Sequence, residues 1–333
     1  MILHPTIIAL LTGSILTGFL VLYAAARGFE IIKRWDIASG SEIQLLLERR
    51  TYLISLMLSY AFVFQMISLF LFVYTTDNLS RLFAGAMCAA GTLYINSYGY
   101  PTLLLKVINF LLAGVWLLIN ATDNKAYNYP LIKKKYLLLI LMAPFVLAET
   151  ISQIQYFIHM SPDIVTSCCG TLFSSAPEIA KNDMPVRSGG FLQKLFFGGF
   201  GLLLLLGIYS YRGSGKGGCM YGIASIAMFV VSIMALISIF SLYIYELPTH
   251  HCPFCLLQRE YGYVGYPIYL TLFLGNVSGI SVGALSQFRN ISSLSGIIPA
   301  VQRKLVLTSL VCYIIFTGIV LYELSVSNLH LDG

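Results

Sequence analysis

The sequence predicts an all-α polytopic membrane protein of about eight transmembrane helices, because of its composition, its apolar runs and the positions of its charges. Of the 333 residues, 58% are hydrophobic and 10% are charged, against roughly 45–50% apolar and about 25% charged residues in globular domains. A lipid bilayer must cover this surplus of apolar side chains, which excludes a soluble fold. The net charge of +6 comes from short basic clusters between the apolar runs, and so we expect no nucleic-acid partner.

Eight apolar runs are long enough to be transmembrane helices, since a hydrocarbon core of roughly 30 Å needs about 20 such residues. The segment 79–100 is only moderately apolar and runs into the helix breakers Gly99 and Pro101. It is therefore either a ninth span or a re-entrant element. The eight runs lie at 6–26, 51–75, 102–120, 136–157, 192–210, 219–245, 262–285 and 305–325.

The positive charges distinguish between these two alternatives, because Lys and Arg prefer short cytoplasmic loops. If 79–100 does not cross, the clusters Arg49-Arg50 and Lys133–Lys135 face the same side, and most other basic residues join them. If 79–100 does cross, the two clusters face opposite sides and the asymmetry disappears. We therefore predict eight spans, with both termini on the extracytoplasmic side.

This topology gathers the residues that carry chemistry on one side of the membrane. Cys219 and Cys312 are the exceptions: they fall in or near the inner halves of helices, where a thiol usually serves as a small buried hydrophobe. Thiols in an oxidising compartment form disulfides or bind metals, and so we expect the functional site in the external loops. The residues placed outside are His4, His159, His250, His251, His330, Cys88, Cys168, Cys169, Cys252 and Cys255.

The strongest local signal is the segment His250–Arg259, HHCPFCLLQR, between the sixth and seventh spans. Pro253 suits a first helical turn, which predicts Cys252 at the N-cap of the seventh helix and Cys255 inside its first turn. Unpaired N–H groups and the helix dipole would stabilise a thiolate there. Arg259 follows Cys255 by four residues and is expected on the same face, where it either binds an anion or a quinone carbonyl or extends to the lipid headgroups. A purely structural disulfide is the alternative for the cysteine pair.

Residues 252–259, Cys-Pro-Phe-Cys-Leu-Leu-Gln-Arg, resemble the active-site segment of the bacterial disulfide-bond formation protein B family. Members of that family oxidise periplasmic thiols and pass the electrons to quinone in the bacterial inner membrane. The resemblance implies that Cys252 exchanges with a second cysteine pair, that Cys255 faces the quinone and that Arg259 helps to bind it. It also implies a soluble extracytoplasmic thioredoxin-like protein as the partner. The match covers eight of the 333 residues.

Cys168 and Cys169, between the fourth and fifth spans, are the candidate second pair. A cysteine loop that precedes the Cys-x-x-Cys resembles the order in vitamin K epoxide reductase relatives. This resemblance implies a four-helix thiol-redox bundle over 136–285, an N-terminal membrane region over 1–135 and a C-terminal span over 286–333. Adjacent cysteines depart from the family pattern, because a disulfide between neighbours is strained. The alternative is that Cys88 pairs with one of them.

Glu149 lies in the fourth span, with Gln153 one turn later on the same face. A carboxylate inside a membrane is costly and is therefore a functional candidate. We expect it either to relay protons when quinone is reduced or to be an interfacial carboxylate that is hydrogen-bonded within the bundle.

The sequence thus supports two functions from different classes. The first is a membrane thiol–disulfide oxidoreductase that passes electrons between extracytoplasmic protein thiols and quinone. The alternative is a protein that binds or transports a soft metal such as copper, zinc or mercury, because thiolates and imidazoles are the preferred ligands of these ions. Its ligands would come from Cys168, Cys169, His250, His251, Cys252 and Cys255, with His159 or Met160 as additional donors.

Overall fold

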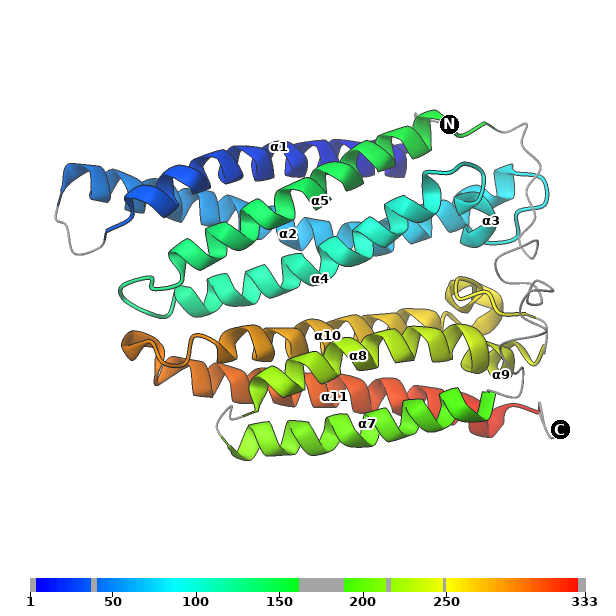
Figure 1. Ribbon diagram of the computed structural model, residues 1–333. Coiled ribbons are helices and arrows are strands. Elements are labelled where there is room, and N and C mark those ends of the chain that lie inside the picture. Colours follow the sequence, from blue (N-terminus) through cyan, green and yellow to red (C-terminus); the bar gives the residue numbers. More distant parts are fainter. Residues whose placement is uncertain (1–3, 37–40, 162–188, 214–216, 248–249, 329–333) are drawn as a thin grey trace, which may run out of the picture. The chain divides into compact units, whose positions relative to one another are not determined.

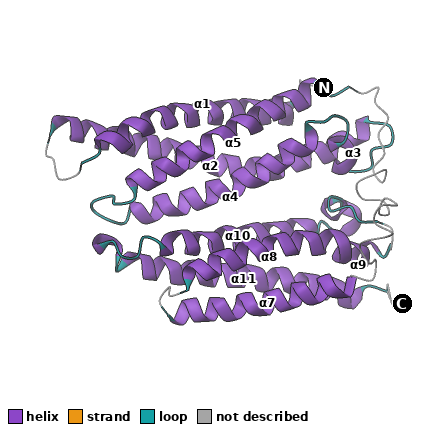
Figure 2. Cartoon of the chain, in the orientation of Figure 1, coloured by secondary structure: helices purple, strands orange, loops and turns teal. Residues whose placement is uncertain are grey.

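The computed structural model describes residues 4–36, 41–161, 189–213, 217–247 and 250–328. Every regular element in these ranges is helical (Figures 1 and 2). Eight of the described helices are long and apolar enough to cross a membrane. They are α1 (Pro5–Arg34), α2 (Glu42–Leu79), α4 (Gly99–Asp123), α5 (Ile132–Ile158), α7 (Gly189–Arg212), the continuous span of α8 (Gly218–Ala235) with α9 (Ser241–Tyr245), α10 (Gly265–Ser286) and α11 (Ile297–Val326).

All eight predicted spans are confirmed as helices, and most of them extend past the predicted ends. Helix α2 begins at Glu42, where the side chain of Ser41 accepts a hydrogen bond of 3.3 Å from the backbone N–H of Gln44. The segment 79–100 does not form a ninth span. It contains a 3₁₀ turn at Ser80–Leu82 and the single short helix α3 (Ala89–Leu93), which is far shorter than the roughly 20 residues that a crossing requires.

The chain divides into two compact units, and the first contains α1, α2, α4 and α5. Helices α1 and α4 both pack against α5, and α2 packs against α1 and α4. Trp116 lies at the centre: its ring meets Phe62 edge to face at 5.1 Å, and its Nε1–H donates to the backbone carbonyl of Lys135 at 3.1 Å. Large apolar side chains such as Phe19 and Tyr60 are more than 70% exposed on the outside, as expected for a lipid-facing surface.

The second unit contains α7, α8 with α9, α10 and α11, together with residues 85–91. Helices α8 and α10 pack closely on each other through small residues. A Cβ added at Gly222 would lie 2.8 Å from the Cα of Gly283, and small residues commonly permit such close approach between membrane helices. Helix α11 joins through the hydroxyl of Ser309, which donates to the carbonyl of Gly275 at 2.7 Å and accepts from Tyr221 at 2.9 Å.

This division differs from the expected segments 1–135, 136–285 and 286–333. Helix α5 belongs to the first unit because its buried face, which includes Tyr136 and Met142, packs on α1 and shares a core with Trp116 of α4. Most of α11 belongs to the second unit with α7, α8 and α10. The helices around the Cys-x-x-Cys segment are therefore spans five to eight rather than four to seven.

Candidate functional site

The Cys-x-x-Cys segment lies in the loop between α9 and α10, and not at the start of a membrane helix as predicted. Cys255–Leu257 form a single 3₁₀ turn, Gln258 is extended, and Arg259–Tyr261 form a second 3₁₀ turn. Gly262 then adopts a left-handed backbone at φ 62°, and α10 begins only at Gly265. The extended residue and the left-handed residue interrupt the helix that Pro253 was expected to start.

The same interruption corrects the predicted place of Arg259. Arg259 belongs to a different 3₁₀ turn from Cys255, so the two do not share a helical face. The Arg259 side chain is exposed.

Hydrogen bonds from neighbouring elements hold this loop in place. The hydroxyl of Tyr245, at the end of α9, donates to the carbonyl of Cys252, and that of Tyr269 in α10 donates to the carbonyl of Pro253 at 2.7 Å. The side-chain amide of Gln258 donates to the carbonyl of Met87 at 2.8 Å. The loop is thus fixed to two helices and to the segment 85–91 of its own unit.

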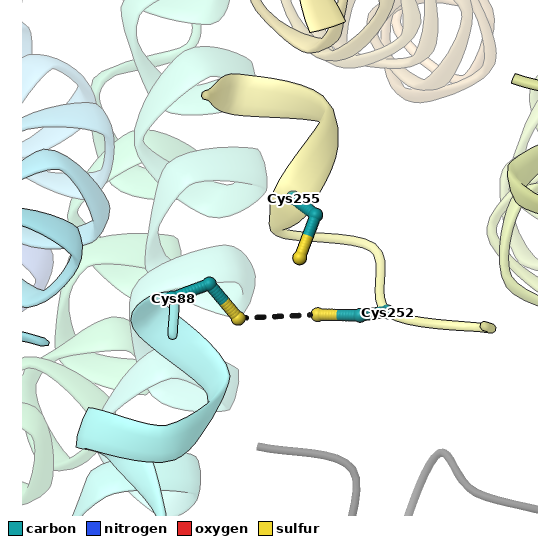
Figure 3. Close-up of side chains that lie close together, drawn as sticks. All are labelled: Cys88, Cys252 and Cys255. Carbon is teal, nitrogen blue, oxygen red and sulfur yellow. Dashed lines mark hydrogen bonds between the residues drawn. The ribbon is translucent and has the colours of Figure 1, made fainter. Parts of the chain in front are cut away.

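This anchoring brings three cysteine sulfurs together (Figure 3). The Sγ atoms of Cys88, Cys252 and Cys255 all lie within 4.8 Å of one another, and those of Cys88 and Cys252 are 3.5 Å apart. All three side chains are buried, and none of the five described cysteines forms a disulfide. We call Cys88, Cys252 and Cys255 the thiol cluster.

A histidine borders the thiol cluster. The Nε2 of His250 lies 3.3 Å from the Sγ of Cys255, and its ring packs edge to face on Tyr245 with centroids 4.7 Å apart. Burial, and then the neighbouring His251, lowers the pKa of His250. The Nδ1 of His251 lies 3.2 Å from the carbonyl of Ile237, and so the two adjacent histidines have different partners.

The thiol cluster favours a charge on one sulfur. Hydrogen bonds from the thiols of Cys255 and Cys88 lower the pKa of Cys252 to about 4, against the cost of burial, with smaller contributions from the backbone N–H groups of Phe254 and Cys255. The pKa of Cys255 is raised, mainly because its hydrogen bonds to Cys252 and then Cys88 favour its protonated form. A thiolate is thus favoured at Cys252, as the sequence suggested, but thiol donors and turn N–H groups stabilise it rather than a helix start.

The other predicted site residues lie apart from this cluster. Cys168 and Cys169 fall outside the described residues. Glu149 belongs to the first unit, where its carboxylate forms an ion pair of 2.8 Å with Lys106 of α4 and accepts hydrogen bonds from the side-chain amides of Gln65 and Asn109. This arrangement fits a carboxylate that is hydrogen-bonded within its bundle.

Sequence reasoning missed two features. Cys88 was placed on the same side as Cys252 but was considered only as a partner of Cys168 or Cys169; its separation of 164 residues from Cys252 carries no pairing signal. The buried pairs Lys106–Glu149 and Lys135–Asp123 (3.1 Å) were also missed. A lysine inside the apolar run 102–120 was the available signal for the first pair.

Comparison with protein-family models, curated proteins and solved structures finds no match to this chain.

Proposed function

We propose that this chain is a membrane thiol–disulfide oxidoreductase that passes electrons between protein thiols and quinone through the thiol cluster. The observation that carries the proposal is the 3.5 Å contact between the sulfurs of Cys88 and Cys252, with Cys255 also within 4.8 Å. One sulfur, that of Cys252, therefore has two disulfide partners within reach of small side-chain movements. A relay needs such a choice of partner, whereas a structural disulfide does not.

A partner dithiol is oxidised in two exchange steps. A thiolate of a partner protein attacks the Cys252–Cys255 disulfide, forms a mixed disulfide with Cys252 and releases Cys255 as a thiolate, which takes up a proton. The second partner thiol displaces Cys252, so the partner gains a disulfide. The cluster gains two electrons and the proton on Cys255, while Cys252 stays a thiolate and the second proton goes to solvent. A quinone then takes the two electrons with the proton of Cys255 and one proton from solvent, becomes hydroquinone and restores the Cys252–Cys255 disulfide. Each step is reversible, so the same chemistry serves electron flow in either direction.

Cys88 adds a transfer within the protein. Its thiolate attacks the Cys252–Cys255 disulfide at Cys252, forms a Cys88–Cys252 bond and leaves Cys255 as a thiolate, while the proton of Cys88 passes to Cys255. The number of electrons in the cluster does not change. We propose that this step separates the sulfur that meets the partner protein from the sulfur that meets the quinone.

The remaining assignments rest on the family resemblance and on the surroundings of the thiol cluster. The resemblance of residues 252–259 to a quinone-linked family favours quinone as the acceptor, a soluble thioredoxin-like partner, and the extracytoplasmic face of a bacterial inner membrane. Aromatic rings beside the cluster offer apolar surface for a flat acceptor: Tyr245 and Tyr261 meet edge to face with centroids 4.6 Å apart. We retain Arg259 as a candidate quinone ligand because of that resemblance, and Glu149 as a candidate proton relay because an intramembrane carboxylate is costly.

The test is quinone reduction by a reduced dithiol protein, measured with the full chain in detergent or nanodiscs. We expect Cys252→Ser to lower the rate to background, and Cys88→Ser to lower it while leaving oxidation of Cys252 and Cys255 intact. Cys219→Ser is the matched control and should keep the parent rate, because Cys219 is exposed on α8 away from the cluster. Activity retained in Cys252→Ser would contradict the proposal.

A further inference from the structure

We propose that the thiol cluster is also a binding site for one soft d¹⁰ cation, Zn²⁺ or Cu⁺, with the sulfurs of Cys88, Cys252 and Cys255 as ligands and His250 as the fourth ligand. This inference goes beyond thiol exchange and does not depend on it. The donor set also differs from the one that the sequence suggested. Cys88 joins it, Cys168 and Cys169 lie outside the described residues, and His251 contacts the carbonyl of Ile237 instead.

The spacing of the sulfurs fits such a cation. A zinc–sulfur bond of about 2.3 Å in tetrahedral geometry implies sulfurs roughly 3.8 Å apart. The observed 3.5 Å between the sulfurs of Cys88 and Cys252 is close to that separation, and all three sulfurs lie within 4.8 Å of one another. In the described part of the chain, Cys88, Cys252 and Cys255 are the one set of three or more His, Cys, Asp or Glu side chains whose donor atoms lie close enough to share a metal ion.

Burial and anchoring support the site further. The three cysteines are at most 6% exposed, so a bound cation would exchange with water slowly and the soft sulfurs would supply most of its coordination. The loop is already held through the carbonyls of Cys252 and Pro253 and through Gln258. Ligands that are held before the metal arrives bind it more tightly than ligands that must be ordered by it.

His250 lies beside Cys255, and its Nε2 is 3.3 Å from the Sγ of Cys255. Tetrahedral geometry with a zinc–nitrogen bond of about 2.0 Å implies roughly 3.5 Å between a nitrogen and a sulfur ligand. The Nε2 atom is not part of the group of donor atoms within 4.8 Å of one another that the three sulfurs form, so the ring must also move towards Cys88 and Cys252 to complete the site. A site of three sulfurs and one imidazole is closed, which fits a structural or storage role better than a catalytic one.

Metal binding and disulfide chemistry exclude each other at this site, because a cation held by all three thiolates leaves no sulfur for exchange. We therefore expect a loaded cluster to resist oxidation. The metal would act as a reversible block on the proposed exchange reaction.

The experiment uses the full chain, reduced and stripped with a chelator, in detergent. Zn²⁺ and Cu⁺ are titrated in separate arms against chromophoric competitors, and X-ray absorption counts the sulfur ligands. We expect one cation per chain in at least one arm, with three sulfurs and one nitrogen. Cys88→Ser should weaken binding by more than the roughly 10–100-fold that loss of an outer-shell partner costs, and His250→Ala should weaken it as well.

Cys219→Ser and Cys312→Ser are the matched controls and should bind like the parent chain, and the unfolding temperature of each variant shows whether it is folded. The inference is overturned if neither cation binds stoichiometrically, or if a folded Cys88→Ser chain binds as tightly as the parent. Unchanged metal affinity in His250→Ala would show that His250 is not a ligand. The failure of this proposal is separable from that of thiol exchange, because quinone reduction is measured on chelator-treated protein.

Discussion

The two units of this protein place their polar chemistry differently. In the first unit the charged groups lie between the membrane helices, where Lys106 meets Glu149 and Lys135 meets Asp123. In the second unit the three clustered thiols lie outside the membrane helices, in the loop between α9 and α10 and in the segment 85–91, and the helices themselves approach through small residues such as Gly222 and Gly283. Charges that satisfy one another hold the helices of the first unit together, whereas hydrogen bonds to a loop hold the thiols of the second.

The largest effect should follow from breaking the ion pair between Lys106 and Glu149 in the first unit. We expect Glu149→Gln to lower the free energy of unfolding by about 3–5 kcal/mol, because Lys106 is then left buried without its counter-charge. The double variant Lys106→Met/Glu149→Gln should recover much of this loss. Chemical denaturation in mixed micelles measures both, and an equally unstable double variant would mean that the pair does not act as a unit.

The same variants test whether the first unit takes part in electron transfer. If the first unit is a scaffold, the folded double variant should reduce quinone at the parent rate. A lost rate in that variant would favour Glu149 as a proton relay, as the sequence suggested.

A second prediction concerns the charge in the thiol cluster. The lowered pKa of Cys252, about 4, means that its thiolate persists as pH falls from about 8 to about 5, whereas an ordinary thiol with a pKa near 8.5 is protonated over that range. The ultraviolet thiolate absorbance of reduced, metal-free protein, minus that of Cys252→Ser, should change little across this range and fall with a midpoint well below that of an ordinary thiol. A midpoint near 8.5 would contradict the description of the cluster.

The smallest effect should come from the helix packing of the second unit. We expect Gly222→Ala to lower the free energy of unfolding by about 1–3 kcal/mol, because the added Cβ would lie 2.8 Å from the Cα of Gly283. Gly201→Ala on α7 is the matched control, since nothing lies within 4 Å of its added Cβ. Equal stability of the two variants would show that α8 and α10 can separate at little cost.

Local sequence patterns predicted the membrane helices, but they did not predict which polar side chains the helices bury. The eight spans were predictable because each consists of a long apolar run. The burial of Lys135 was not, because Lys133–Lys135 look like a cytoplasmic cluster; α5 begins at Ile132, and its helical period turns Lys135 inward while Lys133 and Lys134 stay exposed.

The thiol cluster was only half predictable for similar reasons. The Cys-x-x-Cys motif is local and was identified, but Pro253 is compatible with a 3₁₀ turn as well as with a helix start, and the extended backbone at Gln258 decides for the turn. The approach of Cys88 depends on how two distant loops fold together, which no spacing within either loop encodes.

The most direct test of the contact between Cys88 and Cys252 is a disulfide map of the Cys255→Ser variant. The reduced chain is oxidised mildly in native membranes, remaining thiols are alkylated, and the peptides are identified by mass spectrometry. Since the two sulfurs are 3.5 Å apart, we predict a linked Cys88–Cys252 peptide as the main product. An alkylated Cys88, with Cys252 alkylated or linked elsewhere, would contradict the account.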